Sequence, residues 1–219
     1  MFKRKKEEEK QIALQAFYNI EANLLKNLGS FDNVIAFTST SNHTDQMQNL
    51  YAMARHIAED GPRILLIDTN LRSPQIENVA GRGKERGFID GLLGDYSHES
   101  IIESDEYEKN LTLMTTGKVS DYADKFLEVN DIRNYYDDLR GRYDYVFIST
   151  SENIGIPEAS LFSALADKCV VFTSYANLNN EVYDQSIELL EKASTDILGI
   201  IVTNYVFKET EVDELFGDK

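Results

Sequence analysis

The sequence predicts an α/β fold, a doubly wound and mainly parallel sheet flanked by helices. Short apolar runs in the chain are continuous rather than alternating, as expected of parallel strands that are covered on both faces. Helix-period segments separate most of these runs, which gives right-handed crossovers between neighbouring strands. The predicted strands are residues 33–39, 63–68, 110–115, 143–149, 168–174 and 197–203.

Helices are predicted from apolar residues that recur at helical spacing. An amphipathic helix over residues 10–28 precedes the first strand, and Gly29 ends it. Between the second and third strands, Gly87, Gly91 and Gly94 interrupt short helical pieces. The remaining helices are predicted at about residues 46–60, 121–141, 157–166 and 179–193.

Length and charge set the class of protein. The 219 residues, 42% hydrophobic and 27% charged, predict one domain over residues 1–219 with an acidic tail at 208–219. The net charge of −16 argues against nucleic-acid binding and against direct contact with an anionic membrane. No apolar run approaches the roughly 18 residues of a membrane span. We therefore expect a cytoplasmic protein without membrane insertion, and the single Cys169 is expected to be a buried small hydrophobe.

The segment Asn33 to Pro74 is typical of a nucleotide-binding strand–helix–strand unit. An apolar strand is followed by a Ser/Thr-rich turn, a helix, a glycine stop and a second strand that ends in Asp68. A phosphate-binding turn has the pattern G-x-x-x-x-G-K-[ST], because glycine lets backbone N–H groups close around phosphates and Lys neutralises their charge. Residues 42–47 here are NHTDQM, so the phosphate-binding residues are missing.

Several motifs in the right order resemble a known family, and the resemblance spans about residues 14–205. The chain is similar to the cytoplasmic catalytic domain of the bacterial tyrosine kinases (BY-kinases) of capsule and exopolysaccharide synthesis, within the MinD/ParA-like deviant P-loop ATPases. The resemblance implies a P-loop NTPase fold. The motifs are FTSTS at 37–41, LLIDTNLRSP at 65–74, GFIDGLLGD at 87–95, NLTLMTTG at 110–117, YDYVFIST at 143–150 and ILGIIVTNY at 197–205.

The positions that carry catalysis in this family hold different residues here. In the phosphate-binding turn, the family's glycines fall on His43 and Asp45, and its phosphate-binding Lys falls on Gln46. Its Mg²⁺-binding Ser/Thr falls on Met47 and its Walker B Asp falls on Ser149. In the second acidic motif, Asp68 is kept, but the next acidic residue falls on Asn70. Met cannot ligate a hard cation that prefers oxygen. Removing one electrostatic donor from an enzyme site costs about 3 kcal/mol, so losing several leaves little rate. We interpret the chain as a pseudoenzyme with no catalytic residue and no metal ligand.

Two further family features are also missing. The family's E-x-x-R-x-x-R pattern for ring assembly falls on Gln15, Tyr18 and Glu21, so a charge-paired ring is not expected. The family usually ends in a tyrosine cluster that neighbours phosphorylate, but the last tyrosine here is Tyr205.

A degenerate nucleotide site remains an alternative, with Thr40, Gln46 and Asp68 as its contacts. It would hold ATP and Mg²⁺ only if the site has been rebuilt; otherwise no cofactor is expected. Asp68 lies where α/β sheets place ligands, but it could instead cap its own turn and pair with Arg72.

Other polar features also have two interpretations. The turn 38–44 could bind an anion at a helix N-terminus, or Thr44 or Asp45 could serve as the N-cap of the following helix. The basic loop could contact an anion or a partner, or be simply solvated; it contains Arg82, Lys84 and Arg86. The three histidines lack the spacing of a zinc site.

The leading hypothesis is a catalytically degenerate BY-kinase-like protein, a pseudokinase that binds a protein partner in capsular or exopolysaccharide synthesis or export. The resemblance implies a membrane adaptor of the chain-length-determinant type or an active kinase paralogue as that partner, which would recruit the chain to the inner face of the membrane. One alternative is a residual ATP-binding tyrosine kinase or ATPase. A second is a MinD/ParA-like positioning factor, which the missing Lys weakens equally.

Overall fold

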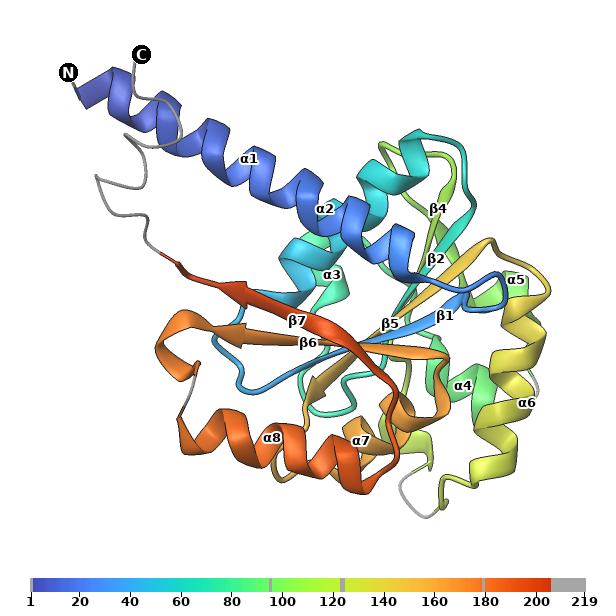
Figure 1. The fold of residues 1–219 in the computed structure, drawn as a ribbon. Helices are drawn as coiled ribbons and strands as arrows, with labels where there is room; N and C mark the ends of the chain where they lie inside the picture. The colour runs from blue at the N-terminus through green and yellow to red at the C-terminus, as the bar shows by residue number, and fades with distance from the viewer. Residues whose placement is uncertain (1, 95, 123–124, 179, 206–219) are drawn as a thin grey trace.

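The protein contains a seven-stranded sheet in the order β3-β4-β2-β5-β1-β6-β7. The structure is a computed structural model that describes residues 2–94, 96–122, 125–178 and 180–205 (Figure 1). Every strand pair is parallel except the short β3–β4 pair at one edge. The strands are β1 (Val34–Ser39), β2 (Ile64–Asp68), β3 (Glu103–Ser104), β4 (Leu111–Met114), β5 (Tyr145–Glu152), β6 (Lys168–Ser174) and β7 (Ile197–Thr203).

Helices cover both faces of the sheet, which confirms the predicted doubly wound α/β fold. On one face lie α1 (Phe2–Asn27), α2 (Gln46–Glu59) and α3 (Ile76–Ala80) (Figure 1). The other face carries α4 (Phe88–Leu93), α5 (His98–Ile101), α6 (Val129–Arg140), α7 (Pro157–Leu165) and α8 (Glu181–Lys192). Two 3₁₀ turns occupy Val119–Tyr122 and Tyr175–Asn177. None of the helices in the described part of the chain combines the length and apolarity that a membrane crossing requires.

The alternation of side chains along the central strands divides the core into two layers. Ile35 and Phe37 of β1 pack toward α1 and α2, whereas Val34 packs toward α6 and α7. Because both faces are covered, all six residues of β1 are buried. Cys169 of β6 is fully buried as predicted, and its burial raises the pKa of the thiol to about 12.

The six predicted strands are confirmed, and the helices differ at their ends. The first helix begins at Phe2 rather than at residue 10. The prediction of a helix over 121–141 is wrong in its first part, because α6 begins only at Val129. Phe126 is 87% exposed, so no packing stabilises a helix there. Strand β3 was not predicted, since two residues give no periodic signal. The predicted acidic tail, 208–219, lies outside the described residues.

Helix α1 is held against α2 by a largely buried pair. Glu21 is only 7% exposed, and its carboxylate Oε2 lies 2.6 Å from Nδ1 of His56 on α2. The ring of Tyr18 lies against the same histidine, with 4.9 Å between ring centroids. Two of the positions that match the family's ring-assembly pattern therefore make contacts inside this chain.

Gly87 allows the loop before α4 to approach the end of β4. A Cβ atom at Gly87 would lie 2.0 Å from the backbone oxygen of Thr115, and that oxygen accepts a hydrogen bond from the Phe88 N–H. We therefore expect Gly87→Ala to reduce the free energy of unfolding by about 1–3 kcal/mol, measured by urea denaturation. Gly141→Ala is the control, because its nearest neighbour is 3.6 Å away and its φ of −72° suits alanine. Equal stability of the two variants would contradict this reading.

Candidate functional site

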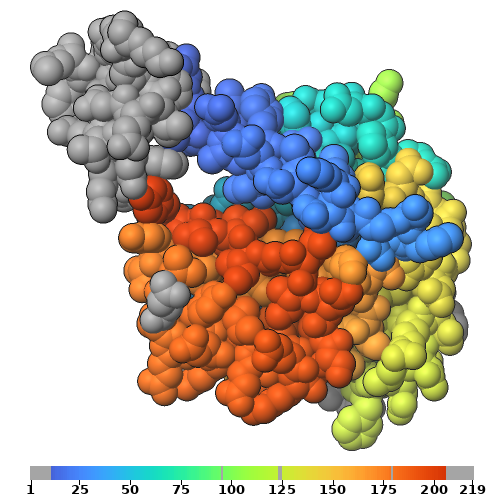
Figure 2. Space-filling model, in the orientation of Figure 1, coloured from blue at the N-terminus to red at the C-terminus, as the bar shows by residue number. Residues whose placement is uncertain are grey.

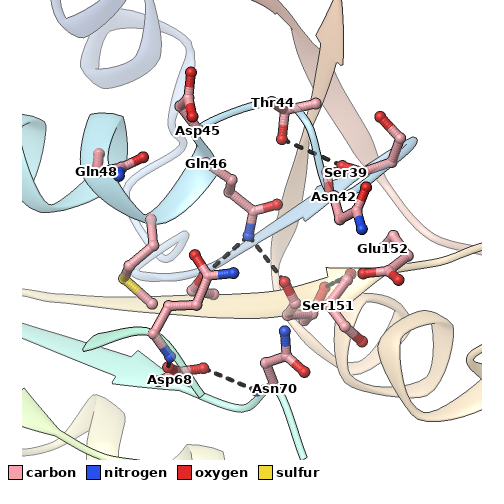
Figure 3. A pocket seen from close by; sticks show the side chains of 15 residues that line it. Ser39, Asn42, Thr44, Asp45, Gln46, Gln48, Asp68, Asn70, Ser151 and Glu152 are labelled. Atoms are coloured by element: carbon pink, nitrogen blue, oxygen red, sulfur yellow. Dashed lines mark hydrogen bonds between the residues drawn. The ribbon is translucent and has the colours of Figure 1, made fainter. Parts of the chain in front are cut away.

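A polar cavity of about 150 Å³ lies at the carboxyl ends of the central strands. Its walls come from the turn between β1 and α2, the loop after β2, and the end of β5 (Figure 3). The connection from β1 to β2 and the connection from β5 to β6 run in opposite directions along the sheet order, and such switch points are where open α/β sheets bind ligands. This cavity is therefore the candidate functional site.

The side chain of Gln46 crosses from α2 to the ends of two strands. Its Nε2 atom lies 2.9 Å from each of three acceptors, the carbonyl oxygens of Phe37 and Thr150 and the hydroxyl of Ser149, which share its two N–H hydrogens. Two carbonyl acceptors on one side of the amide fix which atom is the nitrogen. The opposite atom, Oε1, is buried at the cavity without a hydrogen-bond partner. Gln46 thus joins β1 to β5.

The turn that leads into α2, residues 41–45, contains neither glycine nor lysine. Asp45 occupies the N-cap position in a left-handed conformation, with φ of 51°, and its side chain makes no capping hydrogen bond. Thr44 donates its hydroxyl to the carbonyl of Ser41 at 3.5 Å instead. The prediction that Thr44 or Asp45 is the N-cap of this helix is confirmed for Asp45, although its side chain does not cap a backbone N–H group. Met47 is 3% exposed, packs in the core below the turn and also borders the cavity.

Asp68 holds the loop after β2. Its carboxylate accepts backbone N–H bonds from Asn70 at 2.9 Å, Gln75 at 2.6 Å and Ile76 at 3.0 Å. Burial raises the pKa of this carboxyl group, and the backbone hydrogen bonds oppose the shift. The expectation that Asp68 caps its turn is confirmed. The expected pairing with Arg72 is wrong, since no ion pair joins these two described residues and Arg72 is exposed.

The three predicted contact residues do not all meet. Gln46 and Asp68 line the same cavity, whereas Thr40 is buried beside it and donates its hydroxyl to that of Thr173 at 3.0 Å. The sequence reasoning singled out Ser149 but missed the polar residues that follow it. A signal existed, because the apolar run of β5 continues directly into Ser-Thr-Ser-Glu; the missed lining residues are Thr150, Ser151 and Glu152.

The lining of this cavity does not fit a magnesium-bound triphosphate. It includes the carboxylates of Asp45, Asp68 and Glu152 and no Lys, Arg or His. Its volume is below the roughly 300 Å³ at which ligand pockets usually begin. Across the described residues, no cluster of His, Cys, Asp and Glu could hold a metal ion.

The basic loop between α3 and α4 uses its charges inside the molecule. Arg82 pairs with Glu103 at 3.3 Å, and Lys84 donates to carbonyl oxygens of α5. Arg86 pairs with the buried Asp90 at 2.6 Å and holds the pKa of that carboxyl below its usual value. These contacts anchor the loop and leave no cluster of free cations there for an anion.

Comparison with known proteins gives distant relatives, and no family model matches the chain. EpsB of Ralstonia nicotianae is 24% identical over 149 residues, 68% of this chain and 20% of EpsB. The succinoglycan biosynthesis transport protein ExoP of Rhizobium meliloti is 23% identical over 192 residues, 85% of this chain and 23% of ExoP. The chain thus spans about a fifth of the length of the first of these. The tyrosine-protein kinase CpsD of Streptococcus pneumoniae is 24% identical over 190 residues, 85% of this chain and 82% of CpsD.

Solved structures share the fold. The chimeric protein CapA2B2 superimposes with a TM-score of 0.76 at 24% identity, over 85% of this chain and 82% of that one. The kinase domain of VpsO gives a TM-score of 0.73 at 20% identity, over 94% of this chain and all of that one. The chain therefore has the P-loop NTPase fold. Within that fold, its homologues are bacterial tyrosine kinases.

Replacing Gln46 tests whether its amide joins the two strands. Gln46→Leu removes the Nε2 amide, so two buried carbonyl oxygens and one hydroxyl each lose the hydrogen bond that Gln46 donates. Because an unsatisfied buried polar group costs about 1–3 kcal/mol, we expect a loss of at least about 2 kcal/mol in the free energy of unfolding. Gln48→Leu, at an exposed position of the same helix, is the matched control, with an expected change of about 0.5 kcal/mol or less. A Gln46→Leu protein as stable as the control would show that the three hydrogen bonds contribute nothing.

Proposed function

We propose that this chain is a catalytically degenerate BY-kinase-like protein, a pseudokinase that acts as a protein-binding regulator or scaffold in capsular or exopolysaccharide synthesis or export. The observation that carries the proposal is the position of the Gln46 amide. At the place where the family's motif has its phosphate-binding Lys, this amide is hydrogen-bonded to the ends of β1 and β5.

The charge of the site supports the absence of catalysis. Phosphoryl transfer depends almost entirely on positioning and on neutralising the charge of the phosphates. Here three carboxylates line the cavity, and Met47, at the metal-binding position of the motif, lies in the core. A triphosphate entering this site would meet negative charge without a compensating cation, which is unfavourable in a partly buried environment.

The partner in this proposal is another protein. A membrane adaptor of the chain-length-determinant type fits the resemblance, and an active kinase paralogue is the second candidate. Either would bring a cytoplasmic chain to the inner face of the membrane. The names of two relatives support the setting, since ExoP is a succinoglycan biosynthesis transport protein and CpsD a tyrosine-protein kinase.

The contacts of α1 favour a partner over a ring of identical subunits. Glu21 is buried against His56, and the ring of Tyr18 lies against the same histidine at an interplanar angle of 45°. Because Glu21 is only 7% exposed, its carboxylate is poorly accessible to a cation of another subunit. Together with the absence of the motif's arginines at Tyr18 and Glu21, this disfavours the family's ring contact.

Isothermal titration with Mg-ATP, combined with a phosphate-release assay, tests the proposal. We expect neither heat of binding nor turnover from the wild-type chain, because no cation balances the phosphates. Micromolar binding with turnover would overturn the proposal and favour the rebuilt kinase or ATPase. ATP-dependent dimerisation would favour the MinD/ParA-like positioning factor.

A second variant checks that the assay can detect a restored site. Gln46→Lys together with Met47→Thr returns the charge and the metal ligand of the family motif, so its thermal midpoint should respond more to Mg-ATP than that of the wild type. The Met47→Thr change alone is the control, because it removes core packing without adding a charge. We expect it to lower the free energy of unfolding by about 2–5 kcal/mol. Its thermal midpoint should not change when Mg-ATP is added. A wild type that already responds like the restored variant would contradict the proposal.

A further inference from the structure

In the part of the chain that the structure describes, strand β7 forms an unpaired edge of the sheet. It is the last strand in the sheet order, and within the described residues it pairs only with β6. Figure 2 shows β7, in red, at the surface between α1 and α8. Its sequence, ILGIIVT, has no charge and no proline, the residues that usually protect an edge strand from pairing. Ile200 and Val202 are 40% and 37% exposed.

The side of β7 that faces α1 carries an apolar groove. The groove has a volume of about 190 Å³ and lies between α1 and β7. Ile20 and Leu24 of α1 line one wall, and Leu198 and Ile201 line the other. An extended chain laid along β7 would direct every second side chain toward this groove. Those side chains should be aliphatic.

The other side of β7 faces α8, which is acidic. Ile197 packs in the small core cluster beneath α8. Ile200 also borders the groove, but it pairs with Val171 of that cluster, and Val202 lies two residues further along β7, so both side chains point to the α8 side. The exposed charges of α8 are four carboxylates and one Lys: Glu181, Asp184, Glu188, Glu191 and Lys192. Side chains of an added strand on this side should carry positive charge, with their aliphatic stems covering Ile200 and Val202.

Charge also argues against a second copy of the chain at this edge. Antiparallel pairing of two β7 strands about a two-fold axis would place both α8 helices on the same face of the joined sheet. Their carboxylates would then face one another between molecules that each carry a net charge of −16. A basic partner meets no such repulsion.

We propose that β7 binds, by strand addition, an extended segment of another protein in which aliphatic residues alternate with Lys or Arg. Backbone hydrogen bonds to the free edge supply affinity, and the groove and α8 select the alternating pattern. This site is distinct from the polar cavity at the strand ends, so it does not depend on the proposed loss of catalysis.

The test uses the full chain and a blocked peptide of alternating Val and Lys. Binding is measured by fluorescence anisotropy, and its location by hydrogen exchange of the β7 amides. We expect the peptide to bind at least about tenfold more tightly than an alternating Val and Glu peptide, to weaken as salt increases, and to slow exchange in β7. A peptide with the same composition in two blocks, all Lys and then all Val, should also bind at least about tenfold more weakly.

A variant at the edge separates strand addition from general attraction to an acidic protein. The double variant Ile200→Lys with Val202→Lys places two cations where the lysines of the bound peptide are expected to lie. The repulsion should weaken binding at least about tenfold. Val129→Lys, at a 42% exposed position on α6, is the matched control and should leave binding within about twofold. Circular dichroism establishes that both variants are folded.

Three results would overturn the proposal. The block peptide could bind as tightly as the alternating one, which would show attraction by charge alone. The β7 amides could exchange at the same rate with and without peptide. Sedimentation could show a dimer whose β7 amides are protected without peptide, which would make a second copy the occupant.

Discussion

The hydrogen bonds of Gln46 are the constraint on which the rest of the candidate site depends. One uncharged amide satisfies acceptors at the ends of β1 and β5, strands that no short loop connects. A lysine at this position needs a counter-anion, whereas a carboxamide can be satisfied inside the protein. The first turn of α2 is thereby held close to the sheet, with Met47 buried beneath it. The space that remains is small and acidic.

The fold of a phosphate-binding protein has been kept here while its polar residues serve the structure. Asp68 still follows β2, but its oxygens accept backbone N–H groups of its own loop. Ser149 also makes a contact within the protein, because its hydroxyl accepts a hydrogen bond from the Gln46 amide. The Asp68 carboxylate and the Ser149 hydroxyl therefore have roles in stability that require no ligand. Such a scaffold can be retained for its surfaces.

The sequence predicted the sheet well because burial on both faces leaves a strong local signal. The six continuous apolar runs all became strands, and Asp68 was correctly expected to cap its turn. The failures were non-local. Whether residues near Phe126 form a helix depends on packing, and the Phe126 side chain is 87% exposed. Two of the three hydrogen-bond partners of Gln46, Ser149 and Thr150, lie more than 100 positions away in the chain. No single-sequence pattern encodes those partners.

The direction of Gln46 was the part of the site that only the structure could provide. The sequence motif places Gln46 at the position of a phosphate-binding Lys, and we therefore expected any contact of its side chain to be with a nucleotide. The structure instead turns the nitrogen toward the strands and leaves the oxygen at the cavity. A crystal structure of the full chain soaked with excess Mg-ATP tests this arrangement most directly. The account predicts unchanged density for the Gln46 bridge and no nucleotide in the cavity; ATP and Mg²⁺ between Thr40 and Met47, with the bridge broken, would contradict it.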